Sequence, residues 1–244
     1  MARLRPFATL RYARRGAVAV VTLDRPECLN AYDTAMRDDL HAALAVVDAD
    51  PAVRVLVLRG RGTAFSAGGD LREFGSAPSP VAARAVRWRR DVWGQLLRLR
   101  AATVAAVHGL AVGGGMEMAL LCDLCVAARG ARFALPETGR AMIPGVGATQ
   151  TLPRRVGAGR ALDLVLTGRW LEADEAAGLG LVARVVPPSQ LETAALALAR
   201  RLARLDPRLV VAARRCVRAA HDLTLAEGVA LERRLGLGLE PATP

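Results

Sequence analysis

Short apolar runs alternate with segments of helical spacing along most of the chain, and this alternation restricts the fold most strongly. Residues 16–23 (GAVAVVTL) and 53–58 (VRVLVL) are short and rich in β-branched side chains, and apolar residues recur at helical intervals over 33–47 between them. The pattern continues with a predicted helix over 81–99 and predicted strands over 103–107 and 124–128. Repeated strand–helix–strand crossovers predict an α/β fold with a mostly parallel sheet.

The alternation ends after a predicted strand over 182–186, where Pro187 and Pro188 follow each other. Three helical segments come next, over 191–205, 207–220 and 225–235. We therefore expect a core over residues 1–187, which contains the functional site, and a helical region over 188–244. Such helices either cover the core or pack against a second subunit, and their spacing favours neither. Residues 75–80 (GSAPSP) are expected to form a loop, since small residues and two prolines cannot continue a helix or strand.

The segment GLAVGGGMEMAL, residues 109–120, breaks two local rules within an apolar run. Glycine is a poor residue for a helix interior, and an ionised carboxylate such as that of Glu117 is costly to bury. Glycines ahead of a helix let a ligand oxygen approach the backbone, where the first turn offers N–H groups without partners. The segment thus predicts a site for an oxygen that is, or becomes, negatively charged.

The residues after the glycines argue against a phosphate in this site. A Walker-type loop requires Lys and Ser or Thr, whereas Met116 and Glu117 follow here, and an acidic side chain would repel a pyrophosphate. A carbonyl fits better, because its oxygen becomes negative only during reaction, while Glu117 exchanges a proton with a neighbouring atom.

Two other segments carry related signals. TAFSAGGDLREF, residues 63–74, is a second glycine-rich turn directly after a predicted strand, and it offers a second backbone donor to the same oxygen. Alone, it reads equally well as a surface turn. FALPETGRAMIPGVGATQ, residues 133–150, places Glu137 after a proline, where on its own it would be a solvated loop residue.

Taken in order, five motifs resemble those of the crotonase, or enoyl-CoA hydratase/isomerase, family over about residues 16–186: LDRPECLNA, AFSAGGDL, HGLAVGGGMEMALLCDL, PETGRAMIPGVGATQTL and LEADEAAGLGLVARVV. Each motif is weak alone, but the five in this order are specific. The resemblance implies an α/β fold of the crotonase type, a spiral of ββα repeats followed by a C-terminal helical trimerisation region. It also implies a homotrimer or homohexamer.

The same resemblance implies the chemistry of the site. The backbone N–H groups of Gly69 and Gly114 would hold the thioester oxygen of an acyl-CoA, and Glu117 and Glu137 would be the catalytic pair. Family hydratases use two such glutamates for the syn addition of water to a 2-trans-enoyl-CoA, with one carboxylate activating water for attack on C3. We expect Glu137 to deliver the proton to C2, and Gly145 to help hold the water through its backbone.

The substrate's CoA moiety would run along the AFSAGGDL turn, touching Ala67 and continuing along Asp70 and Leu71. No separate cofactor or metal is expected, because coenzyme A is part of the substrate. The chain departs from many relatives at Glu27 and Cys28, where a lysine often lies near CoA. The alternatives within the family are a Δ3,Δ2-enoyl-CoA isomerase and another acyl-CoA lyase or decarboxylase. The presence of two carboxylates argues against both.

Composition excludes or weakens other functions. The net charge of +11 comes entirely from arginine, which favours phosphate-bearing ligands and leaves an RNA-binding protein on the same scaffold as an alternative of a different class. Only 4% of residues are aromatic and no nucleic-acid module is present, so nucleic acid is an unfavoured partner. The CDLC segment, residues 122–125, reads as a buried strand and no second ligand pair completes a metal site. No stretch has the length and apolarity of a membrane span or a secretion signal, so a cytoplasmic location is expected.

Overall fold

A six-stranded sheet lies at the centre of the computed structural model, which describes residues 7–73, 79 and 90–239. The strand order is β1-β2-β3-β4-β6-β9, with β1 antiparallel to β2 and every other neighbouring pair parallel. The strands are β1 (Leu10–Arg15), β2 (Val18–Leu23), β3 (Val55–Gly60), β4 (Ala102–Val107), β6 (Leu124–Ala128) and β9 (Arg184–Val186). The predicted α/β class with a mostly parallel sheet is confirmed.

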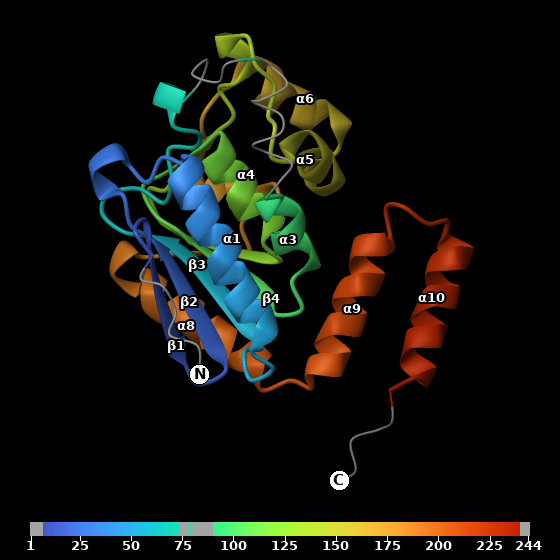
Figure 1. The fold of residues 1–244 in the computed structure, drawn as a ribbon. Helices are drawn as coiled ribbons and strands as arrows, with labels where there is room; N and C mark the ends of the chain where they lie inside the picture. The colour runs from blue at the N-terminus through green and yellow to red at the C-terminus, as the bar shows by residue number, and fades with distance from the viewer. Residues whose placement is uncertain (1–6, 74–78, 80–89, 240–244) are drawn as a thin grey trace.

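Helices cover both faces of this sheet (Figure 1). α1 (Thr34–Ala49), α3 (Val92–Arg98) and α4 (Gly114–Leu121) pack on one face, and α8 (Leu191–Ala203) lies on the other. All six residues of β2 and of β4 are buried, as expected for parallel strands that are covered on both sides. This double burial explains why these strands appear in the sequence as continuous apolar runs.

α1 shows how directly the sequence specifies these elements. Asp33 precedes the helix, and its side chain accepts a hydrogen bond from the Met36 backbone N–H at 2.8 Å, which satisfies one of the free donors of the first turn. One face of the helix is buried against the sheet, through Met36, Leu40, Ala43, Leu44 and Val47. That spacing is the one used to predict the helix.

A smaller layer lies at one end of the main sheet and carries the segments that follow the glycine-led helix. Its three strands are β5 (Leu110–Val112), β7 (Arg132–Ala134) and β8 (Leu171–Glu172). Its helices are α5 (Ala148–Val156), α6 (Ala158–Thr167) and α7 (Ala173–Gly178). Short 3-10 helices occur at η1 (Pro26–Cys28), η2 (Leu71–Glu73), η3 (Thr138–Arg140) and η4 (Pro188–Gln190). β5 and η3 lead into and out of the segments that hold the candidate site.

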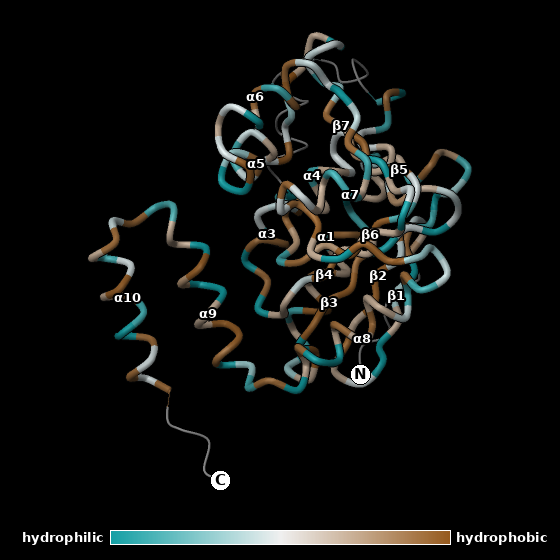
Figure 2. Tube along the Cα trace, turned by 180° about the vertical axis from the view of Figure 1, so that it is seen from behind, coloured by the Kyte–Doolittle hydropathy of each residue, from teal (hydrophilic) through white to brown (hydrophobic). Residues whose placement is uncertain are grey.

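The last two helices, α9 (Pro207–Ala219) and α10 (Leu225–Leu237), form a hairpin that projects from the body (Figures 1 and 2). In the described part of the chain, α9 buries none of its residues and α10 buries only Leu231. Two arginines of α9 hold the hairpin to the body, because Arg214 and Arg218 pair with Asp123 at 2.9 and 2.7 Å. The predicted division into a core and a helical region after residue 187 stays a prediction. α8 follows that boundary in sequence but packs on the main sheet of the core.

The structure confirms the other predicted strands and helices to within a few residues, with one correction. The predicted helix over 81–99 does not run through Arg90 and Asp91, because Asp91 caps a helix that begins at Val92. Residues 81–89 and the expected loop over 75–80, apart from Ser79, lie outside the described residues. No helix within the described ranges is long and apolar enough to cross a membrane.

Candidate active site

The three glycines of the GGGME segment place the start of α4 against neighbouring backbone. Gly113 precedes the helix with φ 50°, a conformation that favours glycine, and Gly114 is the first helical residue. The N–H of Gly114 therefore has no acceptor within the helix. A Cβ on Gly115 would lie 2.3 Å from the Ser66 carbonyl oxygen, so only glycine permits this packing. The Gly114 N–H thus lies close to the turn that contains Ser66.

That second turn is the AFSAGGD segment, which lies between two other chain segments. The Ser66 N–H donates to Leu110 O at 3.0 Å, and Val112 N–H donates back to Ser66 O at 3.0 Å. A Cβ on Gly68 would lie 2.5 Å from Val112 O and 3.0 Å from Gly114 N, while one on Gly114 would lie 3.7 Å from Gly69 N. The backbones of Gly69 and Gly114, predicted from separate segments, are therefore adjacent.

Glu117 lies one turn along α4, and only 1% of it is exposed. Its Oε1 accepts hydrogen bonds from the backbone N–H groups of Val146 (2.8 Å) and Ala148 (2.9 Å). Burial raises the pKa of Glu117, and the backbone N–H groups of residues 145–148 oppose that shift because they stabilise the ionised form. Gly145 thus lies in the loop that surrounds this carboxylate.

Glu137 lies against the glycine turn that precedes α4. It follows β7, and its Oε1 lies 2.8 Å from the position of a Cβ on Gly113, directly against the glycine turn. Its Oε2 is buried and has no hydrogen-bond partner among the described residues. Burial raises the pKa of Glu137 and the negative charge of Glu117 adds to the rise, whereas the backbone of Glu137 itself and the Arg140 cation lower it. A buried carboxyl oxygen without a partner suits a group that exchanges a proton with a ligand.

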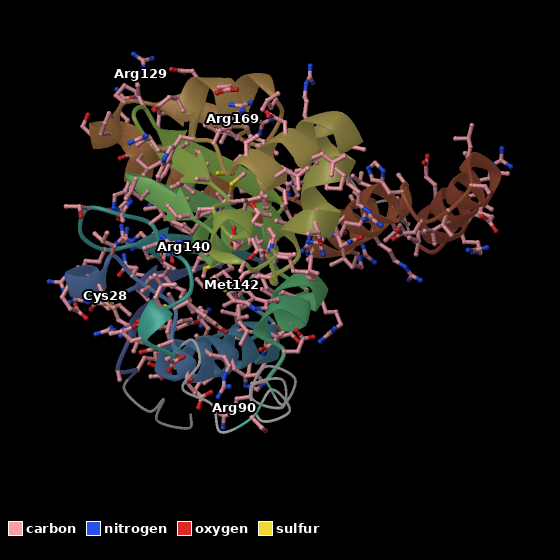
Figure 3. The ribbon with its side chains drawn as sticks, turned by 90° about the horizontal axis from the view of Figure 1, so that it is seen from above. Cys28, Arg90, Arg129, Arg140, Met142 and Arg169 are labelled. Atoms are coloured by element: carbon pink, nitrogen blue, oxygen red, sulfur yellow. The ribbon has the colours of Figure 1, made fainter. Side chains whose placement is uncertain are left out.

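The residues predicted to contact CoA lie at the edge of this site. Ala67 uses its N–H to donate to Leu29 O at 2.9 Å, and Leu71 is exposed. Asp70 is buried, and its carboxylate is already occupied by Arg25 and Arg72, so its side chain has little capacity left for CoA. In Figure 3, Arg140 and Met142, which follow Glu137, lie near each other, and Cys28 lies further toward the N-terminal segment.

Three groups of the site were missed by the sequence reasoning. The N–H donors of Val146 and Ala148 hold Glu117, although only the glycines around them gave a signal. Ser66 is fully buried, and its hydroxyl donates to Asn30 O at 2.8 Å and accepts from Gly68 N at 3.2 Å. The Arg25 side chain bridges two segments 45 residues apart in sequence, which no local pattern reveals.

The two cysteines of the CDLC segment are poorly suited to chemistry. Cys122 and Cys125 are fully buried free thiols, and burial raises the pKa of Cys125 to about 12 and that of Cys122 further. A thiol that stays protonated is a poor nucleophile and a poor metal ligand. Within the described ranges, no group of three or more His, Cys, Asp or Glu residues is arranged to hold a metal ion.

The adjacent Gly69 and Gly114 backbones, the buried Glu117 and the half-buried Glu137 lie at one place, and this arrangement suits chemistry next to a carbonyl. The family model described as enoyl-CoA hydratase/isomerase matches residues 13–237. A "probable enoyl-CoA hydratase" of Rhizobium meliloti (strain 1021) is 40% identical over 94% of this chain and 88% of the relative. The chain therefore belongs to the enoyl-CoA hydratase/isomerase, or crotonase, family.

Solved structures agree with that assignment. The crystal structure of an enoyl-CoA hydratase subunit from Geobacillus kaustophilus HTA426 matches with a TM-score of 0.90 and 38% identity, over 96% of this chain and 90% of that one. A protein from Thermobifida fusca YX, solved in complex with CoA, matches with a TM-score of 0.88 and 32% identity, over 95% of this chain and 92% of that one. The crotonase type of the fold is thereby established.

Proposed function

We propose that this chain is an enoyl-CoA hydratase that catalyses the reversible syn addition of water to a 2-trans-enoyl-CoA. The observation that carries the proposal is the meeting of the buried Glu117 and the half-buried Glu137 beside two adjacent glycine-rich backbone turns. A family member that only shifts a double bond needs one proton-transferring group, whereas addition of water needs one group for the water and one for the carbon.

The backbone supplies the electrostatic part of the reaction. The N–H groups of Gly69 and Gly114 would donate to the thioester oxygen, which gains negative charge when C3 is attacked. Because these donors are fixed by the folded backbone, they need no reorganisation during the reaction. Removing one such donor typically costs about a hundredfold or more in turnover.

The two glutamates divide the proton transfers. Ionised Glu117, held by Val146 and Ala148, takes one proton from water while the water oxygen bonds to C3. Protonated Glu137 gives its proton to C2 as the enolate collapses to the thioester. Water thus contributes the hydroxyl at C3 and a proton left on Glu117, and transfer of that proton to Glu137 restores the starting state. No metal or redox cofactor takes part in this proposed scheme.

The binding mode and setting are further parts of the proposal. The CoA moiety would follow the backbone at Ala67, Asp70 and Leu71, and Gly145 would help to hold the water beside Glu117. The CoA complex of the Thermobifida relative supports binding of an acyl-CoA thioester. Assembly into a homotrimer or homohexamer, with α9 and α10 at the contact, and a cytoplasmic location remain expectations from the family resemblance.

A spectrophotometric screen tests the reaction itself. The full chain would be mixed with 2-trans-enoyl-CoA esters of increasing length, and loss of absorbance from the conjugated double bond would be followed. We expect loss of absorbance with at least one ester and formation of the 3-hydroxyacyl-CoA. Conversion of a 3-enoyl-CoA to its 2-enoyl isomer without hydration would instead establish an isomerase. Tight RNA binding that weakens steeply with salt, with no activity on any ester, would favour the RNA-binding alternative.

A further inference from the structure

The side chain of Arg25 lies between the η1 turn and the glycine turn that carries Gly69. We propose that Arg25 is a positioning residue for the oxyanion hole, because its guanidinium joins the two chain segments that fix the direction of the Gly69 N–H. This inference rests on the proposed function, in which that N–H polarises a thioester. Arg25 itself would touch neither the substrate nor the reacting atoms.

The guanidinium contacts three acceptors at once. One terminal nitrogen donates to Ala31 O at 2.6 Å and to Asp70 Oδ2 at 3.2 Å. The other donates to the same Asp70 oxygen at 3.2 Å and pairs with Asp33 Oδ2 at 3.0 Å. Only 14% of the Arg25 side chain is exposed. A planar fork of donors suits this arrangement, and the single ammonium of lysine cannot reproduce it.

The three partners of Arg25 enclose the contact that orients Gly69. Tyr32, which lies between Ala31 and Asp33, donates its N–H to Gly68 O at 2.7 Å and accepts from Asp70 N–H at 2.9 Å. These bonds form a parallel bridge between Tyr32 and Gly69. Because the groups on both sides of Gly69 face Tyr32, the N–H of Gly69 faces the opposite way. The Gly69 nitrogen lies 3.7 Å from the position of a Cβ on Gly114.

Other contacts hold different parts of the same turn. The Asn30 side-chain amide donates to Arg61 O and Ala64 O, both at 2.8 Å, and thus fixes the start of the turn. Arg72 binds Asp70 at 2.6 and 2.9 Å, but it is the next residue but one and its side chain is 72% exposed. Arg25 therefore ties Asp70 itself to a distant segment, while the Glu73 carboxylate, three residues further on, accepts from the Thr34 N–H at 3.0 Å.

Charge explains why loss of Arg25 would move the turn. Hydrogen bonding by Arg72, assisted by Arg25, outweighs burial and holds the pKa of Asp70 well below its usual range. Without Arg25, the Asp33 and Asp70 carboxylates would face each other with one cation fewer, and like charges repel. A displacement of the catalytic backbone by about 1 Å can cost a hundredfold in rate.

The test compares Arg25→Gln and Arg25→Lys with Arg61→Gln in the full chain. Arg61 is a suitable control because its side chain is exposed and also pairs with an aspartate, Asp24, at 2.8 Å. Three quantities would be measured: kcat and KM for crotonyl-CoA, the melting temperature, and the absorption band of bound dimethylaminocinnamoyl-CoA. That band moves to longer wavelength when the thioester carbonyl is polarised, so it reports directly on the oxyanion hole.

We expect Arg25→Gln to lower kcat by at least about tenfold with little change in KM, and to reduce the red shift of the bound probe. Arg25→Lys should reduce the red shift less, and Arg61→Gln should leave kcat and the red shift unchanged. A variant Arg25→Gln that melts earlier but keeps wild-type kcat and red shift would overturn the inference. If Arg25→Gln does not fold, an unchanged red shift and kcat in Arg25→Lys would overturn it in the same way.

The probe also separates this inference from the proposed function. A wild-type protein that shifts the probe band but hydrates no ester would contradict the hydratase assignment, and the red shifts of the variants would still decide the role of Arg25. A wild-type protein that binds the probe without any red shift has no oxyanion hole, and both proposals would then be wrong.

Discussion

Glu117 and Glu137 are both glutamates, but the structure holds their carboxyl groups in different ways. Glu117 projects from a helix, is almost completely buried and accepts two backbone hydrogen bonds on one oxygen. Glu137 immediately precedes η3, and its Oε2 is buried with no hydrogen-bond partner in the part of the chain that the structure describes. One carboxylate is therefore fixed by the fold, whereas the other keeps an oxygen available.

The difference separates the roles of an acid and a base. Burial raises the pKa of both groups, but backbone N–H donors favour the ionised form of Glu117, and the resulting negative charge favours the protonated form of Glu137. Two neighbouring carboxyl groups in different hydrogen-bonding environments are the usual arrangement for paired acid–base work. The geometry therefore supports Glu117 as the base and Glu137 as the acid.

The largest expected effect comes from removing either carboxylate. Glu117→Gln and Glu137→Gln should each lower kcat by at least about a hundredfold and leave CoA binding nearly intact, because each removes a proton-transfer group without removing the backbone donors. Measured pH–rate profiles should also differ. Glu117→Gln should lose the acidic limb, where the base becomes protonated, and Glu137→Gln should lose the alkaline limb.

Glu172→Gln is the matched control for these variants. Glu172 is an exposed residue of β8 whose side chain pairs with Arg132, and its replacement should leave kcat unchanged. Near-full hydration activity in both site variants would exclude the two-carboxylate mechanism. Loss of the same limb in both variants would contradict the division of roles, even if both rates fall.

A smaller effect on kcat is expected when the proposed oxyanion hole is disturbed and both glutamates remain. Gly68→Ala would place a Cβ 2.5 Å from Val112 O and 3.0 Å from Gly114 N, and Gly68 has φ 86°. The two turns must then separate, and we expect kcat to fall by at least about tenfold while the pH limbs stay in place. Kinetics and thermal melting would measure the two consequences.

Gly130→Ala is the control that separates the effect of backbone strain from the effect of pushing the two glycine turns apart. Gly130 has a similar φ of 81°, but a Cβ there would meet nothing within 4 Å. Both variants should melt earlier, since alanine is strained at such φ values, by about 1 kcal/mol or more of stability. Only Gly68→Ala should lose activity, and an equal loss in the two variants would show that the approach of the turns does not matter.

The sequence predicted the main sheet well because its strands are covered on both sides. β2 and β4 appear as continuous apolar runs for that reason. β1 lies at the sheet edge, is half arginine and mostly exposed, and was missed. β5 and β7 have three residues each, which is too short for a periodic signal.

In the candidate site, the sequence pointed to the residues that are unusual in their local sequence context. The glycines and Glu117 break local rules, and the family resemblance added Glu137. The donors of Val146 and Ala148, and the Arg25 bridge, arise only when distant segments meet. Backbone N–H groups have no sequence signature, and an arginine beside a proline reads as an ordinary turn residue.

The smallest effect is expected at Arg140, which tests the electrostatic part of the comparison. Its cation lowers the pKa of Glu137, against burial and the charge of Glu117, which raise it. Arg140→Gln removes the lowering influence, so the pKa of Glu137 should rise and the alkaline limb of the pH–rate profile should move to higher pH. The rate at neutral pH should change by less than about fivefold, because an exposed charge acts through water.

Arg129→Gln provides the reference for that shift. Arg129 is also an exposed arginine, and Figure 3 places it away from Arg140 and Met142. The net charge changes equally in the two variants, so a general effect of charge would move both profiles alike, and only the local effect predicts a shift confined to Arg140→Gln. A shift of the alkaline limb to lower pH would mean that the limb reports a group other than Glu137, and the acid would then have to be sought elsewhere in the site.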